Sequence, residues 1–258
     1  MIDCAACIGS YPFRELPHPD PEVLVRVLAR EGMSGAWVGW LPSAWHRDPT
    51  PGNESLFTAL APHRDVLHPA PVVRPDWPGW QRALRRLVEQ GASCIRAYPM
   101  HWGMAPHDDG LRVLALACAE LGVPLLLTVR FEDLRQRHPL DVAGDLTAAH
   151  VRALARAGDV RLVVAGAGRE LLEETHWGLT PEEQRRVHWD FAWIWGPPED
   201  HLAHLFRTVG AERFVYGTGW PLRLTQNPRA SLDLLPADLR ERGITDARSL
   251  APIRKTPT

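Results

Sequence analysis

The chain has 258 residues, of which 45% are hydrophobic and 23% are charged, and its formal net charge at pH 7 is -2. This composition supports a sizeable core and excludes a disordered chain. The near-neutral charge argues against a nucleic-acid partner, which requires a basic face. No apolar run reaches the 18 residues of a membrane span, and no signal-peptide pattern opens the chain, so we expect a cytoplasmic protein with no membrane partner.

Short apolar runs rich in β-branched residues alternate with helical patterns along the chain. The predicted strands are Ile2–Cys7, Gly35–Leu41, Val66–Val73, Cys94–Pro99, Pro124–Arg130, Arg161–Gly166, Arg186–Trp193 and Arg213–Thr218. The predicted helices are Pro21–Glu31, Trp80–Gln90, Asp109–Leu121, Leu146–Ala157, Thr180–Arg185, Asp200–Val209 and Ser231–Arg242. Asn53, with Glu54 in the first turn, is the expected cap of one further helix.

Eight strands with helices between them predict one α/β domain, a (β/α)8 TIM barrel that spans residues 1–258. A doubly wound open sheet is the alternative. That fold favours a glycine-rich phosphate loop after an early strand, and the sequence contains neither GxGxxG nor GxxxxGK[ST]. In a barrel the reacting groups stand at the carboxyl ends of the strands and in the loops that follow them.

Five segments resemble a known family in their order and spacing. They are IDCAACIGSYPF, GASCIRAYP, ELGVPLLLTVR, RLVVAGAGR and ERFVYGTGWPLR. Together they resemble the metal-dependent amidohydrolase superfamily, in the branch of aminocarboxymuconate-semialdehyde decarboxylase-like proteins. The resemblance runs from Ile2 to about Leu250. It implies a TIM barrel and, as the family's chemistry, hydrolysis or nonoxidative decarboxylation.

The resemblance also implies where a metal would be held. The family's His-x-His pair falls on Ala5 and Cys7, its strand-five His on Thr128, its strand-six His on Gly166 and its aspartate on Gly219. Alanine and glycine have no ligand atom, and a neutral hydroxyl is a poor partner for zinc. We therefore expect no metal and no cofactor. A metal site elsewhere, for example on His201 and His204 three residues apart, is the minority alternative.

Arginines stand near several predicted strand ends, at Arg74, Arg96 and Arg130, and in a loop at Arg223. Arg96 shares a strand face with Tyr98, and Thr128 shares one with Arg130. Guanidinium groups suit carboxylates, so Arg96, Arg130 and Thr128 are predicted to bind a small anionic ligand. Structural salt bridges to nearby acids such as Glu132, Asp133 or Asp190 are an equally weighted alternative.

Candidate catalytic groups are Asp190, Cys7 and Tyr98. Asp190 is the acid of the seventh predicted strand and shares a face with His188, which lies deeper in the strand. A carboxylate there could act as a general base. Eleven tryptophans are also present, and Trp193 and Trp220 are predicted to wall an apolar pocket, with core filling as the alternative.

Two functions follow from these residues. The first is a metal-independent hydrolase or C–C lyase that acts on a small carboxylated substrate. The second is a noncatalytic barrel that binds a ligand or a partner protein and has lost its metal site. A homodimer is left open.

Overall fold

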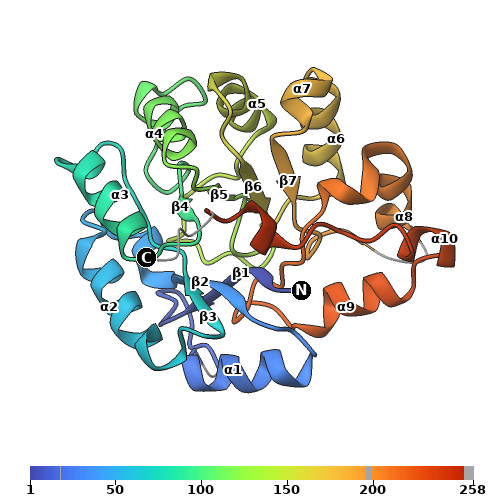
Figure 1. Cartoon of the computed structure of the whole chain (residues 1–258), viewed down its shortest axis with the longest axis horizontal. Coiled ribbons are helices and arrows are strands. Elements are labelled where there is room, and N and C mark those ends of the chain that lie inside the picture. Colours follow the sequence, from blue (N-terminus) through green and yellow to red (C-terminus); the bar gives the residue numbers. More distant parts are fainter. Residues whose placement is uncertain (18, 196–198, 253–258) are drawn as a thin grey trace, which may run out of the picture.

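Parallel strands form the centre of the molecule and helices surround them (Figure 1). The computed structural model describes residues 1–17, 19–195 and 199–252. Within these residues the strands are β1 (Asp3–Ile8), β2 (Ala36–Trp40), β3 (Leu67–Pro69), β4 (Ile95–Ala97), β5 (Leu125–Thr128), β6 (Leu162–Ala165) and β7 (Val187–Trp189). The first seven predicted strands are confirmed in position, although most are shorter than expected.

Backbone bonds close the strands into a (β/α)8 barrel. β1, β2 and β3 pair in chain order, as do β4 to β7. A bridge between Val72 and Arg96 joins the two sets, and a bridge from Trp189 to Phe214 adds the eighth position. The Cys4 amide then donates to the Tyr216 carbonyl at 2.8 Å and completes the ring. The predicted eighth strand is thus an extended segment held by isolated bridges.

The helices of the outer layer follow the strands in alternation. They are α1 (Pro21–Arg30), α2 (Thr50–Leu60), α3 (Trp80–Glu89), α4 (Asp109–Glu120), α5 (Ala148–Ala157), α6 (Arg169–Trp177), α7 (Pro181–Gln184), α8 (His201–Leu205), α9 (Gln226–Asp233) and α10 (Ala237–Arg240). Short 3-10 turns lie at Leu41–Ala44, Ala61–His63, Ala211–Arg213 and Ala247–Leu250, and a π turn continues α8 over Phe206–Gly210. α6 was not among the predicted helices.

Two helix predictions are wrong. The predicted helix Ser231–Arg242 is divided into α9 and α10, because Pro236 lies between them and cannot donate a backbone hydrogen bond. Asn53 does not cap a helix, because α2 already begins at Thr50. Its side chain instead donates to the Val72 carbonyl and accepts from the Val72 amide, both at 2.8 Å, and so ties α2 to the chain after β3.

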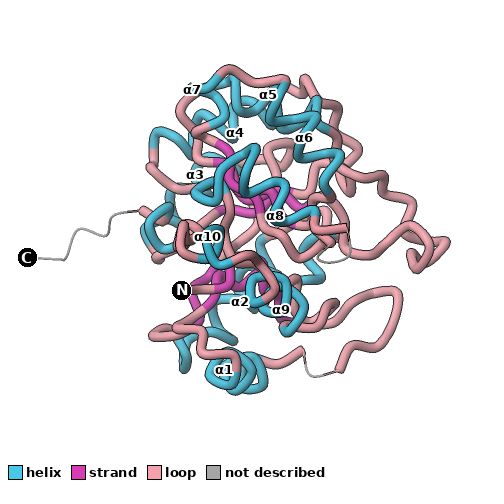
Figure 2. The backbone as a smooth tube through the Cα atoms, turned by 90° about the vertical axis from the view of Figure 1, so that its right-hand side faces the viewer, coloured by secondary structure: helices cyan, strands magenta, loops and turns pink. Residues whose placement is uncertain are grey.

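The barrel wall is buried on both sides, and the loops project from one end. All six residues of β1 and all four of β6 are buried, as expected for a parallel sheet covered by helices. The long loops lie at the end of the barrel opposite the N-terminus (Figure 2). No helix in the described part of the chain is long and apolar enough to span a bilayer.

Candidate active site

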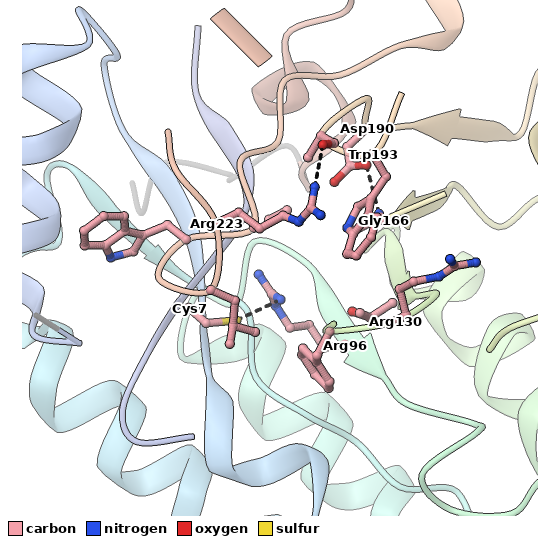
Figure 3. Close-up of a pocket in the computed structure, with 15 residues that line it drawn as sticks. Cys7, Arg96, Arg130, Gly166, Asp190, Trp193 and Arg223 are labelled. Atoms are coloured by element: carbon pink, nitrogen blue, oxygen red, sulfur yellow. Dashed lines mark hydrogen bonds between the residues drawn. The ribbon is translucent and has the colours of Figure 1, made fainter. Parts of the chain in front are cut away.

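A small cavity of about 40 Å³ lies among the carboxyl ends of the strands (Figure 3). It has room for about three water-sized groups, because one water needs roughly 10–15 Å³. Its lining residues are Ala5, Cys7, Arg96, Thr128, Arg130, Phe131, Ala165, Gly166, Asp190, Ala192, Trp193, Gly219, Trp220, Leu222 and Arg223. We refer to this space as the inner cavity.

Asp190 is the acid of the inner cavity. It directly follows β7, and its side chain is 1% exposed. Its Oδ1 atom accepts the Gly166 amide at 2.9 Å, and Gly166 adopts a positive φ of 80° that suits glycine. Burial and, to a lesser extent, the nearby Asp3 raise the pKa of Asp190, the Gly166 and Ala192 amides and the positive charge of Arg223 lower it, and the net pKa is about 7. Asp190 is therefore able to gain or lose a proton near neutral pH.

A second buried carboxyl, Asp3, fixes the floor of the site. Its Oδ2 accepts the Thr218 hydroxyl at 2.5 Å, and its Oδ1 accepts the amides of Ala5 and Thr218 at 2.9 and 3.1 Å. These bonds join β1 to the segment after the eighth strand position. Gly217 in that segment has no room for a side chain, because a Cβ atom would lie 2.8 Å from the Asp190 Cβ. Asp3 thus acts as a structural anchor that holds the backbone against Asp190.

Arg96 lies within the barrel beside Cys7. Its side chain is 2% exposed, and Nη1 donates to the Cys7 Sγ at 3.3 Å (Figure 3). Nη2 donates to the carbonyls of Ala6 at 2.8 Å and Trp37 at 3.4 Å. Burial raises the pKa of the Cys7 thiol, and the Arg96 charge offsets this only in part. Cys7 is therefore a neutral thiol at physiological pH, which makes it a weak nucleophile.

Two further arginines stand at the outer edge of the inner cavity. Arg223 donates to the Ala192 carbonyl at 2.8 Å, and its guanidinium carbon lies 3.3 Å from the centre of the Trp193 ring. Arg130 is ion-paired with Asp145 at 2.8 Å and turns away from the centre of the group (Figure 3). The salt bridge expected for Arg130 therefore exists, but its partner is Asp145 and not one of the three acids predicted.

The other acids named as partners bind elsewhere. Glu132 pairs with Arg14 at 2.7 Å, and Asp133 pairs with Arg135 at 2.8 Å. Asp190 makes its bond with the Gly166 amide. The guanidinium groups of Arg96 and Arg223 consequently remain available to the cavity.

A larger opening adjoins the inner cavity and has a volume of about 660 Å³. We call it the outer mouth. It shares Phe131, Ala192, Trp193, Leu222 and Arg223 with the inner cavity. Trp195 and Leu224, which are 66% and 74% exposed, add apolar surface to it. The two spaces together offer a small polar end and a broad, partly apolar entrance.

The structure brings most of the predicted site residues together. Asp190, Cys7, Arg96, Thr128, Arg130, Trp193 and Trp220 all line the inner cavity. Tyr98 does not line it, and its ring packs at 5.5 Å from Phe131 in an aromatic cluster. His188 also lies outside the lining, and burial lowers its pKa to about 4. Arg223, the loop arginine of the expected anion-binding mouth, also lines the cavity, whereas Phe131, Ala192 and Leu222 were not among the predicted site residues.

The residues present do not fit a divalent metal ion. No three His, Cys, Asp or Glu side chains lie together as a metal site would require in residues 1–17, 19–195 and 199–252. His204, proposed with His201 as a chelating pair, binds the Glu173 carboxylate at 2.8 Å. The acceptor atoms of the inner cavity are those of Cys7, Thr128 and Asp190, and the Arg96 guanidinium, which repels cations, is bonded to the first of them.

The closed barrel and the polar cavity at the carboxyl ends of its strands define the class of (β/α)8-barrel proteins. A family model described as Amidohydrolase matches residues 42–244, and the chain belongs to this family. The resemblance noted in the sequence is thereby confirmed at the level of the family.

Solved structures of the same fold include several enzymes. 2,6-Dihydroxybenzoate decarboxylase from Rhizobium has 15% sequence identity and a TM-score of 0.71, over 96% of this chain and 97% of that one. 5-Carboxyvanillate decarboxylase from Sphingomonas paucimobilis has 10% identity and a TM-score of 0.65, over 93% and 95%. 4-Oxalomesaconate hydratase from Rhodopseudomonas palustris has 12% identity and a TM-score of 0.65, over 93% and 92%. No curated protein matches the chain in sequence.

Proposed function

We propose that this protein is a hydrolase or C–C lyase that acts on a small carboxylated substrate without a metal ion. The observation that carries this proposal is Asp190, a buried carboxyl with a pKa of about 7 that lines a cavity with three arginines. A buried acid with a raised pKa lowers the stability of the fold, and groups of this kind are found preferentially at functional sites. The decarboxylases and the hydratase of the same fold support the class of reaction by analogy.

Each residue has a definite role in the proposal. Arg96 and Arg223 bind the substrate carboxylate, Thr128 supplies a hydroxyl, and Trp193 and Trp220 form the walls. In a C–C lyase reaction the Asp190 carboxyl transfers its proton to the carbon that loses carbon dioxide, and the resulting carboxylate regains a proton from water. In hydrolysis the Asp190 carboxylate accepts a proton from the water that attacks the scissile carbonyl carbon, and returns it to the leaving group as the C–O or C–N bond breaks.

The test uses a panel of small aromatic and aliphatic carboxylic acids, followed by NMR. We expect turnover of at least one acid, with a pH dependence set by a group of pKa near 7. Asp190→Asn, which keeps the shape of the side chain, should lower that turnover by about 10²- to 10⁴-fold. Binding of these acids without turnover of any would favour the noncatalytic alternative, a ligand-binding barrel that has lost its chemistry.

Loss of the metal site is a separate part of the proposal. Elemental analysis of protein purified without chelator should find far less than one zinc or manganese ion per chain. A stoichiometric zinc or manganese ion would refute metal independence.

The sequence adds three expectations to this proposal. They are a cytoplasmic location, no nucleic-acid partner and, left open, a homodimer. The four cysteines, all free, support a reducing compartment.

A further inference from the structure

Three residues of the inner cavity's lining carry a hydrogen-bond donor that has no partner in the described part of the chain. These buried atoms are the Nε of Arg96, which lies against Gly39, the Nε of Arg130, whose guanidinium turns toward Asp145, and the Nε1 of Trp220. All three atoms are donors and cannot accept. A buried donor without a partner destabilises the site, so a ligand that accepts hydrogen bonds is favoured here.

Arg96 has a further donor held by a weak partner. Its Nη1 donates to the Cys7 Sγ, and a neutral thiol is a poor acceptor. Both side chains line the inner cavity, so an oxygen anion in that space reaches the same nitrogen. A charge-assisted bond to such an anion is about twice as strong as a bond between neutral groups. The bond to Cys7 therefore holds the guanidinium in position until a better acceptor arrives.

The charge of Arg96 is fixed in place. The carbonyls of Ala6 and Trp37 hold Nη2, and Gly39 leaves room for the stem, since a Cβ there would lie 2.7 Å from the Arg96 Nε. A carboxylate head has three heavy atoms, which matches the roughly three water-sized groups that the cavity can hold. The remainder of any larger ligand must then extend past Trp193 and Arg223 into the outer mouth.

We infer that the inner cavity is an anion subsite in which the Arg96 guanidinium is the fixed positive charge and the Trp220 indole a second donor. It takes the carboxylate of an acid whose apolar body lies in the outer mouth, against Trp193, Trp195 and Leu224. The inference deepens the proposed function, on which it rests for calling this acid a substrate. The anion subsite itself requires no turnover.

Binding of benzoate to the full chain tests this inference, measured by calorimetry and by tryptophan fluorescence. Benzamide, its neutral counterpart of the same shape, is the control ligand. Arg96→Met should weaken benzoate binding at least about tenfold, the loss of a charged hydrogen bond, and Arg96→Lys should weaken it less. Trp220→Phe, which removes only the indole N–H, should weaken it about threefold or more. Arg82→Met, on the exposed surface of α3, should leave it unchanged.

Two results would overturn the inference: equal binding of benzamide and benzoate to the unaltered protein, or undiminished benzoate binding in both Arg96→Met and Trp220→Phe. The ligand pair and Trp220→Phe keep the test decisive if Arg96→Met fails to fold. Benzoate binding that depends on Arg96, without turnover of any acid, counts against the proposed function alone. Turnover that survives Arg96→Met with unchanged KM counts against this inference and the role given to Arg96, and leaves the proposed reaction itself standing.

Discussion

Replacement of Asp190 by asparagine should stabilise the protein at neutral and alkaline pH. An unfolded aspartate has a pKa of 3.8, and burial raises the pKa of Asp190 to about 7. Between these values the native state keeps a proton that the unfolded state has lost, so the free energy of unfolding falls as pH rises. Below pH 3.8 both states are protonated and the contribution vanishes. Asparagine is neutral throughout, and its Oδ1 can still accept the Gly166 amide.

The size of the effect follows from the difference between the two pKa values. At about 1.4 kcal/mol per pKa unit, a rise from 3.8 to about 7 costs the wild-type protein at most about 4 kcal/mol above pH 7. Asp190→Asn should therefore be more stable than wild type by up to that amount at pH 8. The advantage should shrink through pH 6 and 5 and be small at pH 4.

Urea unfolding followed by tryptophan fluorescence measures this difference at each pH. Asp133→Asn is the matched control, because hydrogen bonds from Arg135 lower the pKa of Asp133 to about 2. That carboxylate stabilises the protein above pH 3.8 and loses this contribution as pH falls, so the control should be destabilised at pH 8. A pH-independent difference between wild type and Asp190→Asn would refute the raised pKa and the acid–base role built on it.

Three further substitutions test the packing around the site. Gly39→Ala places a Cβ 2.7 Å from the Arg96 Nε, so the free energy of unfolding in urea should fall by about 1–3 kcal/mol; Gly168→Ala, with open space around it, should change it little. Thr218→Val removes the hydroxyl that donates to Asp3 and should cost about 1–3 kcal/mol, whereas Thr218→Ser should restore most of it; equal stability of the two would contradict a role for the hydroxyl. Trp193→Leu removes the ring beneath Arg223 and should lower the free energy of unfolding by about 0.5–2 kcal/mol, seen as a lower thermal midpoint. Trp177→Leu, which changes an exposed side chain, should leave the midpoint unchanged.

The barrel could be predicted because its signal is local and repeated. Each buried strand is a short apolar run, and glycine or proline often marks the end of the helix between two strands, as Gly122 and Pro124 do after α4. The errors occur where one residue changes the outcome. Pro236 divides the last helix, and Asn53 binds Val72, which lies 19 residues further along the chain. No local sequence pattern indicates a contact between two residues so far apart in the chain.

The candidate site could be predicted only in part, because strand alternation stops where strands stop. Arg96 lies inside β4, so its inward face follows from the period of two. Tyr98 lies one residue beyond the end of β4, where burial raises its pKa and the charge of the nearby Arg96 lowers it, so it lies close to Arg96 as the alternation predicts but is not part of the cavity lining. Arg223 follows a turn at Gly219, whose φ of 72° reverses the backbone, and no periodicity places a loop residue over Trp193. Asp145, the ion-pair partner of Arg130, also lies in a loop, so strand periodicity could not identify it.

The site holds its acid, Asp190, apart from its buried positive charge, Arg96. This separation allows both groups to act on one ligand. Asp190 bonds to the Gly166 amide, and Arg96 bonds to Cys7, Ala6 and Trp37, so the two charges do not neutralise each other. A protonated Asp190 does not compete with an incoming carboxylate for the guanidinium. Once bound, that carboxylate raises the pKa of Asp190 further, because like charges disfavour ionisation. Ligand binding therefore holds a proton on Asp190 beside the ligand, which is the state from which an acid-catalysed step can begin.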